Sequence, residues 1–290
     1  MKILLPVDGS RHSLNAARFV AERLLPADPE AELQILHVRF RIPPRAAAAV
    51  GRGLLEEYYR DEMHEAVKGV RQLLDRQHVQ YKLLRMVGHP GAEIARHAEA
   101  AGVDLVVMGS HGLGVVKGLV LGSVTQGVIA GCDVPLLVVR DEQVRASGGE
   151  VLVAVDGSAH TRKAVAYLLR HRDLLLASSR ITLMHVSPRL LSPRFTFATG
   201  KAALQQQREQ EREQAMRGAR RLLAKVRGLK CKEVHASGDP GECIADYARG
   251  NRCSLIVMGS HGRGGMTSLL LGSVAQKTLA AGRTPVLIIR

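Results

Sequence analysis

Aromatic residues and cysteines are scarce in this chain. Aromatic side chains make up 3% of its 290 residues, and there is no tryptophan. Proteins that bind single-stranded nucleic acid stack bases on aromatic side chains, so this composition argues against that class. The cysteines lie at 132, 231, 243 and 253 and form no C-x-x-C pair. With His235, three of them could be imagined as zinc ligands, but the spacing matches no standard pattern. We therefore expect neither a disulfide framework nor a metal site built from side chains.

The chain also lacks long apolar runs. No run reaches the roughly 18 residues that a membrane span needs. The first ten residues, MKILLPVDGS, contain only a short apolar run, whereas a signal peptide has an apolar region of about 7–15 residues followed by a cleavage site. This pattern predicts a β-strand over residues 2–7, and we expect a cytoplasmic protein that does not associate with a membrane.

Positive charge is concentrated in the second half of the chain. The formal net charge is +14, of which residues 1–145 contribute +1 and residues 146–290 contribute +13. A basic surface attracts nucleic acid and other polyanions without sequence specificity, and a predicted polar helix at 201–227 is the segment best placed to do so. Because stacking platforms are missing, we expect solvated arginines on helix faces and no nucleic-acid partner.

The second half of the sequence repeats the first. KILLPVDGS (2–10) returns as EVLVAVDGS (150–158), and the hexapeptide VMGSHG occurs at 107–112 and again at 257–262. Internal repetition on this scale indicates a duplicated domain. We therefore predict one domain over residues 1–141 and a second over residues 149–290. The linker between them, 142–148, is rich in charge, Ser and Gly.

Each repeat alternates short apolar runs with helix-like segments. In the first repeat the runs are nearly continuous and suit strands buried on both faces of a parallel sheet; they lie at 2–7, 33–38, 80–87, 104–108 and 135–139. Helices are predicted over residues 15–25, with Ser10 as N-cap, and over 53–77, 92–101 and 115–130. Alternation of this kind predicts an α/β protein: two tandem doubly wound, Rossmann-like domains.

Three polar features of each repeat come together at the carboxyl ends of the strands if strands one and four are neighbours. In doubly wound sheets this is the edge at which ligands bind. They are Asp8 (Asp156) after strand one, the glycine loop after strand four, and a Gly-Ser pair at the start of the last helix. The loop glycines suit a tight turn, and the Gly-Ser pair suits an anionic oxygen. Neither the P-loop motif nor the dinucleotide motif is present.

The pattern Gly109-x2-Gly112-x9-Gly122-Ser123, repeated from Gly259 to Ser273, resembles the nucleotide-binding universal stress proteins (the UspA family) in their tandem form. The resemblance covers about 140 residues in each half. It implies a five-stranded parallel sheet in the order 3-2-1-4-5. It also implies bound ATP, or AMP or ADP in its place, with Mg²⁺ or Mn²⁺ on the phosphates.

Carried onto matching positions, the resemblance implies one nucleotide site in each repeat. The first comprises Pro6, Val7, Asp8, Val38, Met108, Gly109, His111, Gly112, Gly122, Ser123 and Val124. The second comprises Ala154, Val155, Asp156, Val186, Met258, Gly259, His261, Gly262, Gly272, Ser273 and Val274. The aspartates would lie near the adenosine. Val38 and Val186 would line the adenine pocket, and Val7 and Val155 would offer a backbone amide or carbonyl to the base.

Structural roles compete with these assignments. Asp8 and Asp156 could close Asx turns before the first helix, and Ser123 and Ser273 could cap the last one. His111 and His261 have no nucleophile with an acid beside it in the sequence, so we expect no catalytic residues and a loop-shaping or phosphate-facing role for these histidines. His37 and His185 are expected in the core or at the sheet edge.

The two repeats differ within the loops: Leu113 aligns with Arg263, and Lys117 aligns with Thr267. These departures suggest pockets that differ in affinity or in phosphate contacts. The fifth strands, at 134–139 and 284–289, are apolar edges, and the resemblance implies association through them as an intramolecular pseudo-dimer or a homodimer.

A nucleotide-dependent stress-response protein is the predicted function. A slow ATPase or self-phosphorylating enzyme is the alternative, and a polyanion binder is a third hypothesis.

Overall fold

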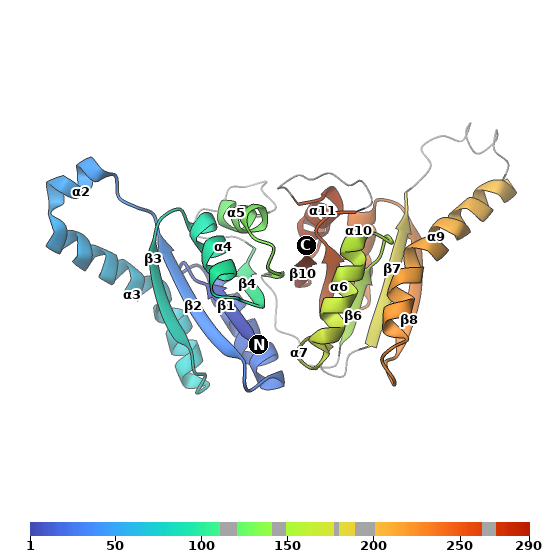
Figure 1. Ribbon diagram of the computed structural model, residues 1–290, viewed down its shortest axis with the longest axis horizontal. Helices are drawn as coiled ribbons and strands as arrows, with labels where there is room; N and C mark the ends of the chain where they lie inside the picture. The colour runs from blue at the N-terminus through green and yellow to red at the C-terminus, as the bar shows by residue number, and fades with distance from the viewer. Residues whose placement is uncertain (111–120, 141–148, 177–179, 189–200, 263–270) are drawn as a thin grey trace. The chain divides into compact units, whose positions relative to one another are not determined.

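The computed structural model describes residues 1–110, 121–140, 149–176, 180–188, 201–262 and 271–290, and the chain divides into two compact units, 1–144 and 145–290. Each unit is a parallel five-stranded sheet with helices on both faces (Figure 1). The fold class expected from the sequence is therefore confirmed.

The first domain has the strand order β3-β2-β1-β4-β5, as the resemblance implied. Its strands are β1 (Lys2–Pro6), β2 (Glu32–Arg39), β3 (Lys82–Val87), β4 (Leu105–Gly109) and β5 (Leu136–Val139). Every residue of β4 and β5 is buried, which explains their continuous apolar sequences.

Helices of the first domain connect successive strands as crossovers. They are α1 (Arg11–Phe19) with the π-helical turn η1 (Val20–Leu24) and the 3-10 turn η2 (Leu25–Ala27), α2 (Pro44–Val50), α3 (Arg52–Arg76), α4 (Pro90–Ala100) and α5 (Ser123–Gly131). Helix α1 packs beside α3, and α4 packs beside α5. Right-handed crossovers place these two pairs on opposite faces of the sheet.

Helices α4 and α5 pack very closely against each other. A Cβ added at Gly91 would lie 3.0 Å from the Cα of Gly127. In the second domain, a Cβ at Gly241 would lie 3.1 Å from the backbone nitrogen of Thr278. Glycine at the first turn of this helix therefore sets how near the two helices lie.

The second domain repeats the arrangement in the order β8-β7-β6-β9-β10. Its strands are β6 (Glu150–Ala154), β7 (Arg180–Ser187), β8 (Cys231–Ser237), β9 (Leu255–Gly259) and β10 (Val286–Ile289). Its helices are α6 (Ala159–Arg170), α7 (Arg172–Leu176), α9 (Lys201–Leu223), α10 (Pro240–Gly250) and α11 (Ser273–Ala281).

Two expectations about helices need correction, and one helix was not predicted. The last helix of the first domain begins at Ser123 rather than at 115, and residues 115–120 lie outside the described part of the chain. Helix α2 was not expected, because its alanine-rich sequence carries no apolar period. The expectation of a solvated helix at 201–227 is wrong for the latter half of α9, where Ala215, Met216 and Ala219 are fully buried.

Candidate functional site

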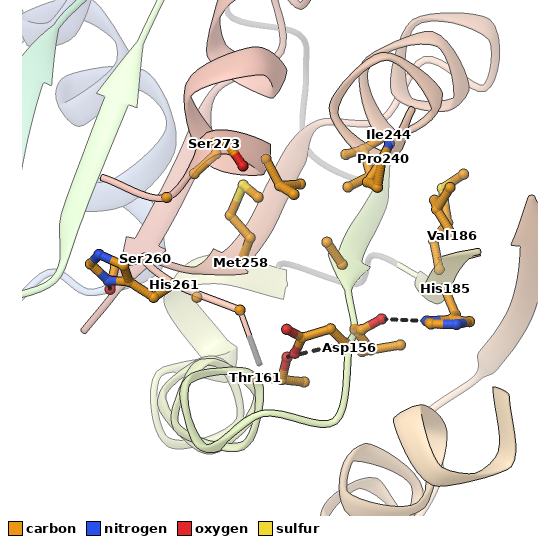
Figure 2. Close-up of a pocket in the computed structure, with 18 residues that line it drawn as sticks. Asp156, Thr161, His185, Val186, Pro240, Ile244, Met258, Ser260, His261 and Ser273 are labelled. Carbon is orange, nitrogen blue, oxygen red and sulfur yellow. Dashed lines mark hydrogen bonds between the residues drawn. The ribbon is translucent and has the colours of Figure 1, made fainter. Parts of the chain in front are cut away.

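A cavity of about 330 Å³ opens at the carboxyl ends of β6, β7 and β9 in the second domain. Figure 2 shows Pro240 and Ile244 of α10 on one side of it and Asp156 with Thr161 on the other. All eleven residues that the sequence selected in this repeat line the cavity: Ala154, Val155, Asp156, Val186, Met258, Gly259, His261, Gly262, Gly272, Ser273 and Val274. The structure thus brings the second set of candidate residues together around one space.

The aspartate after the first strand closes a turn in both domains. Asp156 Oδ1 accepts hydrogen bonds from the amide of Ser158 at 2.9 Å and from Thr161 Oγ1 at 2.6 Å. In the first domain, Asp8 Oδ1 accepts from the amide of Ser10 at 3.0 Å. The following glycine, Gly157, has φ of 80°, a conformation that few other residues adopt. One oxygen of each carboxylate, Oδ1, therefore closes an Asx turn, as the structural alternative predicted.

The second carboxylate oxygen of Asp156 has a different neighbour. A Cβ added at Gly262 would lie 2.9 Å from Asp156 Oδ2, so this oxygen faces the glycine loop. A carboxylate oxygen can accept more than one hydrogen bond, so Oδ2, which lies beside the glycine loop, is placed to accept one from a ligand hydroxyl. One carboxylate can thus serve both the turn and the cavity.

Two buried histidines fix the backbone at the end of the first strand of each domain. His37 Nδ1 lies 2.8 Å from the carbonyl oxygen of Val7, and His185 Nδ1 lies 3.0 Å from that of Val155 (Figure 2). The side chains are 7% and 8% exposed, so the expected core position is confirmed. Since a carbonyl oxygen can only accept, each Nδ1 carries a proton and donates it.

This arrangement narrows what Val7 and Val155 can offer a ligand. Their amides donate to the carbonyl oxygens of Leu36 and Met184, each at 2.9 Å. Both amides are therefore engaged in hydrogen bonds between strands and do not donate to a ligand. Only the second lone pair of each carbonyl oxygen remains for a donor such as an exocyclic amino group.

The last helix of each domain starts at the cavity with an uncovered first turn. Gly122 and Gly272 are the N-caps of α5 and α11, and neither has a side chain to cap the helix. Ser123 and Ser273 occupy the first helical position, so they are not N-caps. The first amides of a helix lack partners within it, and the helix dipole favours an anion there. Figure 2 shows Ser273 beside Met258 at this side of the cavity.

The loop glycines have structural roles of their own. A Cβ at Gly109 would lie 2.6 Å from the carbonyl carbon of His12, and a Cβ at Gly259 would lie 3.1 Å from that of His160. The amides of Ser110 and Ser260 donate to the fifth strand, at 3.1 and 2.7 Å. The amides of these two serines therefore pair with the sheet and do not face the cavity.

Histidines gather beside the glycine loop of the second domain. The rings of His160 and His261 lie 5.8 Å apart, and His261 Nδ1 lies 3.1 Å from Ser260 Oγ. Burial lowers the pKa of His160, and the neighbouring His261 and Lys163 lower it further. Ser260 is only 1% exposed, so its hydroxyl is largely shielded from solvent.

A larger cavity, of about 740 Å³, occupies the equivalent place in the first domain. It is lined by nine of the selected residues: Pro6, Val7, Asp8, Val38, Met108, Gly109, Gly122, Ser123 and Val124. The remaining two, His111 and Gly112, lie outside the described residues.

Side chains of α3 form a wall of the first cavity that sequence reasoning did not find. Asp61, Glu62 and Glu65 line it together with Tyr58. Glu62 forms an ion pair with Arg39, whose Nη2 also donates to the Tyr58 hydroxyl at 2.8 Å. The second cavity has no counterpart of this wall among its described lining residues. The two cavities therefore differ in charge beyond the loop positions noted in the sequence.

Other lining residues were also missed. Thr161, Met184, Pro240, Ile244 and Ser260 line the second cavity. Thr161 could have been found from the sequence, because it lies three positions after the N-cap Ser158. At that position its hydroxyl reaches the Asp156 carboxylate. The others contribute apolar surface or a buried hydroxyl, which a sequence pattern alone does not assign to a cavity.

Within the described ranges there is no group of three or more His, Cys, Asp or Glu that could hold a metal ion. Burial raises the pKa of Cys253 to about 12, which keeps it a protonated thiol. A search of the described helices finds none long and apolar enough to cross a membrane.

These features define a duplicated doubly wound α/β domain with a cavity at the carboxyl ends of the strands in each copy. The chain belongs to the universal stress protein family, whose sequence model matches residues 1–140 and 149–290. It is 27% identical to a universal stress protein of Mycolicibacterium smegmatis over 99% of this chain and 96% of that protein. It is 31% identical to universal stress protein YxiE of Bacillus subtilis over 48% of this chain and 98% of that protein.

A solved structure of a universal stress protein from Archaeoglobus fulgidus has the same fold along the whole chain. Its TM-score is 0.69, with 100% of this chain and 98% of that one covered, at 21% sequence identity. At this identity the likeness concerns the fold.

Proposed function

We propose that each domain binds an adenine nucleotide, with ATP preferred over AMP or ADP, and that the protein acts as a nucleotide-dependent regulator of the stress response. One observation carries the proposal. In both domains, an uncapped helix start, an aspartate and the end of the second strand border a single cavity. Phosphates would be held at Ser123 and Ser273, ribose at the aspartates, and the base beside Val38 and Val186.

A divalent cation would be held through the nucleotide. The described side chains form no cluster of metal ligands, so Mg²⁺ or Mn²⁺ would rest on phosphate oxygens and water. The cation would then neutralise phosphate charge, which matters most in the first cavity, where Asp8 and the carboxylates of α3 would otherwise repel the phosphates.

Binding without rapid turnover is favoured over catalysis. Ser260, the hydroxyl beside a histidine, is buried. A slow ATPase or self-phosphorylation at Ser123 or Ser273 is the alternative. The test is to purify the protein, denature it and analyse the released nucleotide. Two equivalents of intact ATP after hours of incubation support the proposal, whereas steady release of ADP contradicts it.

Two glycine substitutions test the sites separately. Gly112→Val and Gly262→Val should each remove one equivalent of nucleotide, because a side chain at Gly262 would press on Asp156. If neither variant loses nucleotide, the sites are misplaced.

Association through the fifth strands, as an intramolecular pair or as a homodimer of the chain, stays a prediction. Analytical ultracentrifugation of the full chain distinguishes a monomer from a homodimer.

A further inference from the structure

The outer side of α6 and α9 in the second domain carries cations without carboxylates. Arg162, Lys163 and Arg170 are exposed on α6, and Arg217, Arg221 and Lys225 are exposed on and just after α9. Neither residues 159–170 nor residues 214–230 include an Asp or Glu. We call these six side chains the basic face.

Packing of the two helices joins the six side chains into one surface. The Cγ and Cδ atoms of Arg162 would lie 3.1 Å from a Cβ built at Gly218, so this arginine lies against α9. Arg217 and Lys225 are eight residues apart, about 12 Å along a helix. The axes of packed helices are about 8–10 Å apart. The basic face therefore extends over roughly two turns of both helices.

The nearby carboxylates are engaged elsewhere. Glu213 and Glu233 both pair with Arg220, at 2.6 Å in each case. Arg162 donates to the carbonyl oxygen of Gly157 at 3.1 Å, a bond that leaves its charge in place. Among the residues with described positions, no carboxylate pairs with a member of the basic face.

The duplicated domain provides an internal comparison. The contact of Arg162 with Gly218 corresponds to that of Leu14 with Gly69, which fixes the alignment of the helices. At the positions of the basic face, the first domain has Leu14, Asn15, Glu22, Lys68, Gln72 and Arg76. Six cations in the second domain thus correspond to two cations and one anion in the first. Lys68 is further compensated by Glu65 at 3.3 Å.

We propose that the basic face binds the phosphate backbone of double-stranded nucleic acid. B-form duplex carries one phosphate charge per about 1.7 Å of its axis with both strands counted, so a 12 Å stretch contains about seven phosphates, a number comparable to the six cations. The one aromatic residue of α6, Tyr167, is half-buried with its ring 4.5 Å from that of His171. Without a stacking platform the face recognises charge rather than unpaired bases. This inference revises the sequence-based expectation of a purely solvated helix and no nucleic-acid partner.

Fluorescence anisotropy of the full chain with a labelled duplex of about 20 base pairs tests the proposal. The logarithm of the binding constant should fall against that of the salt concentration with a slope of about −4 to −5, for four to six phosphates neutralised. The double variant Arg217→Gln/Lys225→Gln should reduce this slope by about 1.8 and weaken binding at least tenfold at 100 mM salt. The matched variant Lys68→Gln/Arg76→Gln removes two charges at equivalent positions of the first domain and should change affinity less than twofold.

Three results would overturn the proposal. Equal weakening by the two variants would assign binding to net charge rather than to the basic face. Tighter binding of a single strand of the same length would exclude a duplex ligand. Binding to anionic lipid vesicles but not to duplex would identify a membrane surface instead. All six side chains are exposed, so unchanged thermal unfolding should accompany each variant, and nucleotide content should stay as in the parent protein.

Discussion

Replacing Asp156 by asparagine separates the two roles of its carboxylate. Asparagine keeps an oxygen that can accept from the Ser158 amide and the Thr161 hydroxyl, the two bonds of 2.9 and 2.6 Å that hold the turn. It replaces Oδ2, the atom facing Gly262, by an amide that donates. The turn should therefore survive, and a hydrogen bond to a ligand hydroxyl should be lost.

The magnitudes follow from these bonds. Asp156→Asn keeps both turn bonds but with an uncharged acceptor and should lower the free energy of unfolding by about 1 kcal/mol, whereas Asp156→Ala loses both bonds and should cost about 3 kcal/mol. A hydrogen bond to a charged group contributes about 1.5–3 kcal/mol, so nucleotide affinity of the second domain should fall roughly 10- to 100-fold.

Isothermal titration calorimetry with ATP, after removal of bound nucleotide, measures both sites in one chain. Asp156→Asn should leave one site at parental affinity, and Asp8→Asn should affect the other. If Asp156→Asn binds ATP at both sites like the parent, the carboxylate serves the turn alone. If it is as unstable as Asp156→Ala, the assignment of Oδ1 to the turn fails.

Three further predictions concern stability. Gly91→Ala should destabilise the first domain by about 1–3 kcal/mol in urea unfolding, because its Cβ would lie 3.0 Å from Gly127; an unchanged midpoint would contradict this close packing. Gly53→Ala, in a helix with nothing within 4 Å of the added Cβ, should instead raise stability by about 0.5–1 kcal/mol, and a loss would be evidence against helix there. The ammonium of Lys277 lowers the pKa of Asp239, so this carboxylate stabilises the fold above its ordinary pKa of about 3.9, and the contribution disappears as pH falls through the depressed value. Asp239→Asn should therefore lose less stability than the parent between pH 5 and 3, and parallel curves would argue against the pair.

Much of the fold could be predicted because apolar runs and turn residues are local signals. The strands at 33–38 and 135–139 were expected within one or two residues of β2 and β5. Ser10 caps α1 as predicted, accepting from the Ser13 amide at 3.2 Å. Strand order came from the resemblance rather than from any local pattern, since apolar runs do not specify neighbours.

The cavities were less predictable where they depend on tertiary packing. The acidic wall of the first cavity comes from α3, a helix whose charge pattern looks like an ordinary solvated face. Tertiary packing brings that face to the site, including the contact of Ala66 with Gly9, where an added Cβ would lie 3.1 Å from the Ala66 Cα. The hydrogen bonds that occupy the Val7 and Val155 amides likewise depend on strand pairing, which the sequence does not display.

The segment between the fourth strand and the last helix is tied together at its base. The amide of Gly122 donates to the carbonyl oxygen of Ser110 at 3.0 Å, and that of Gly272 to Ser260 at 2.8 Å. Each bond joins points twelve positions apart in the chain. Doubling the length of a closed loop adds only about 0.6 kcal/mol of closure entropy.

Positions beyond Gly112 and Gly262 can therefore differ between the two copies without moving the helix start. The two copies already differ there, at Leu113 against Arg263 and Lys117 against Thr267. A substitution at these positions should therefore change the sequence beside the cavity while the start of the last helix stays in place, held by the bond from Gly122 to Ser110 or from Gly272 to Ser260.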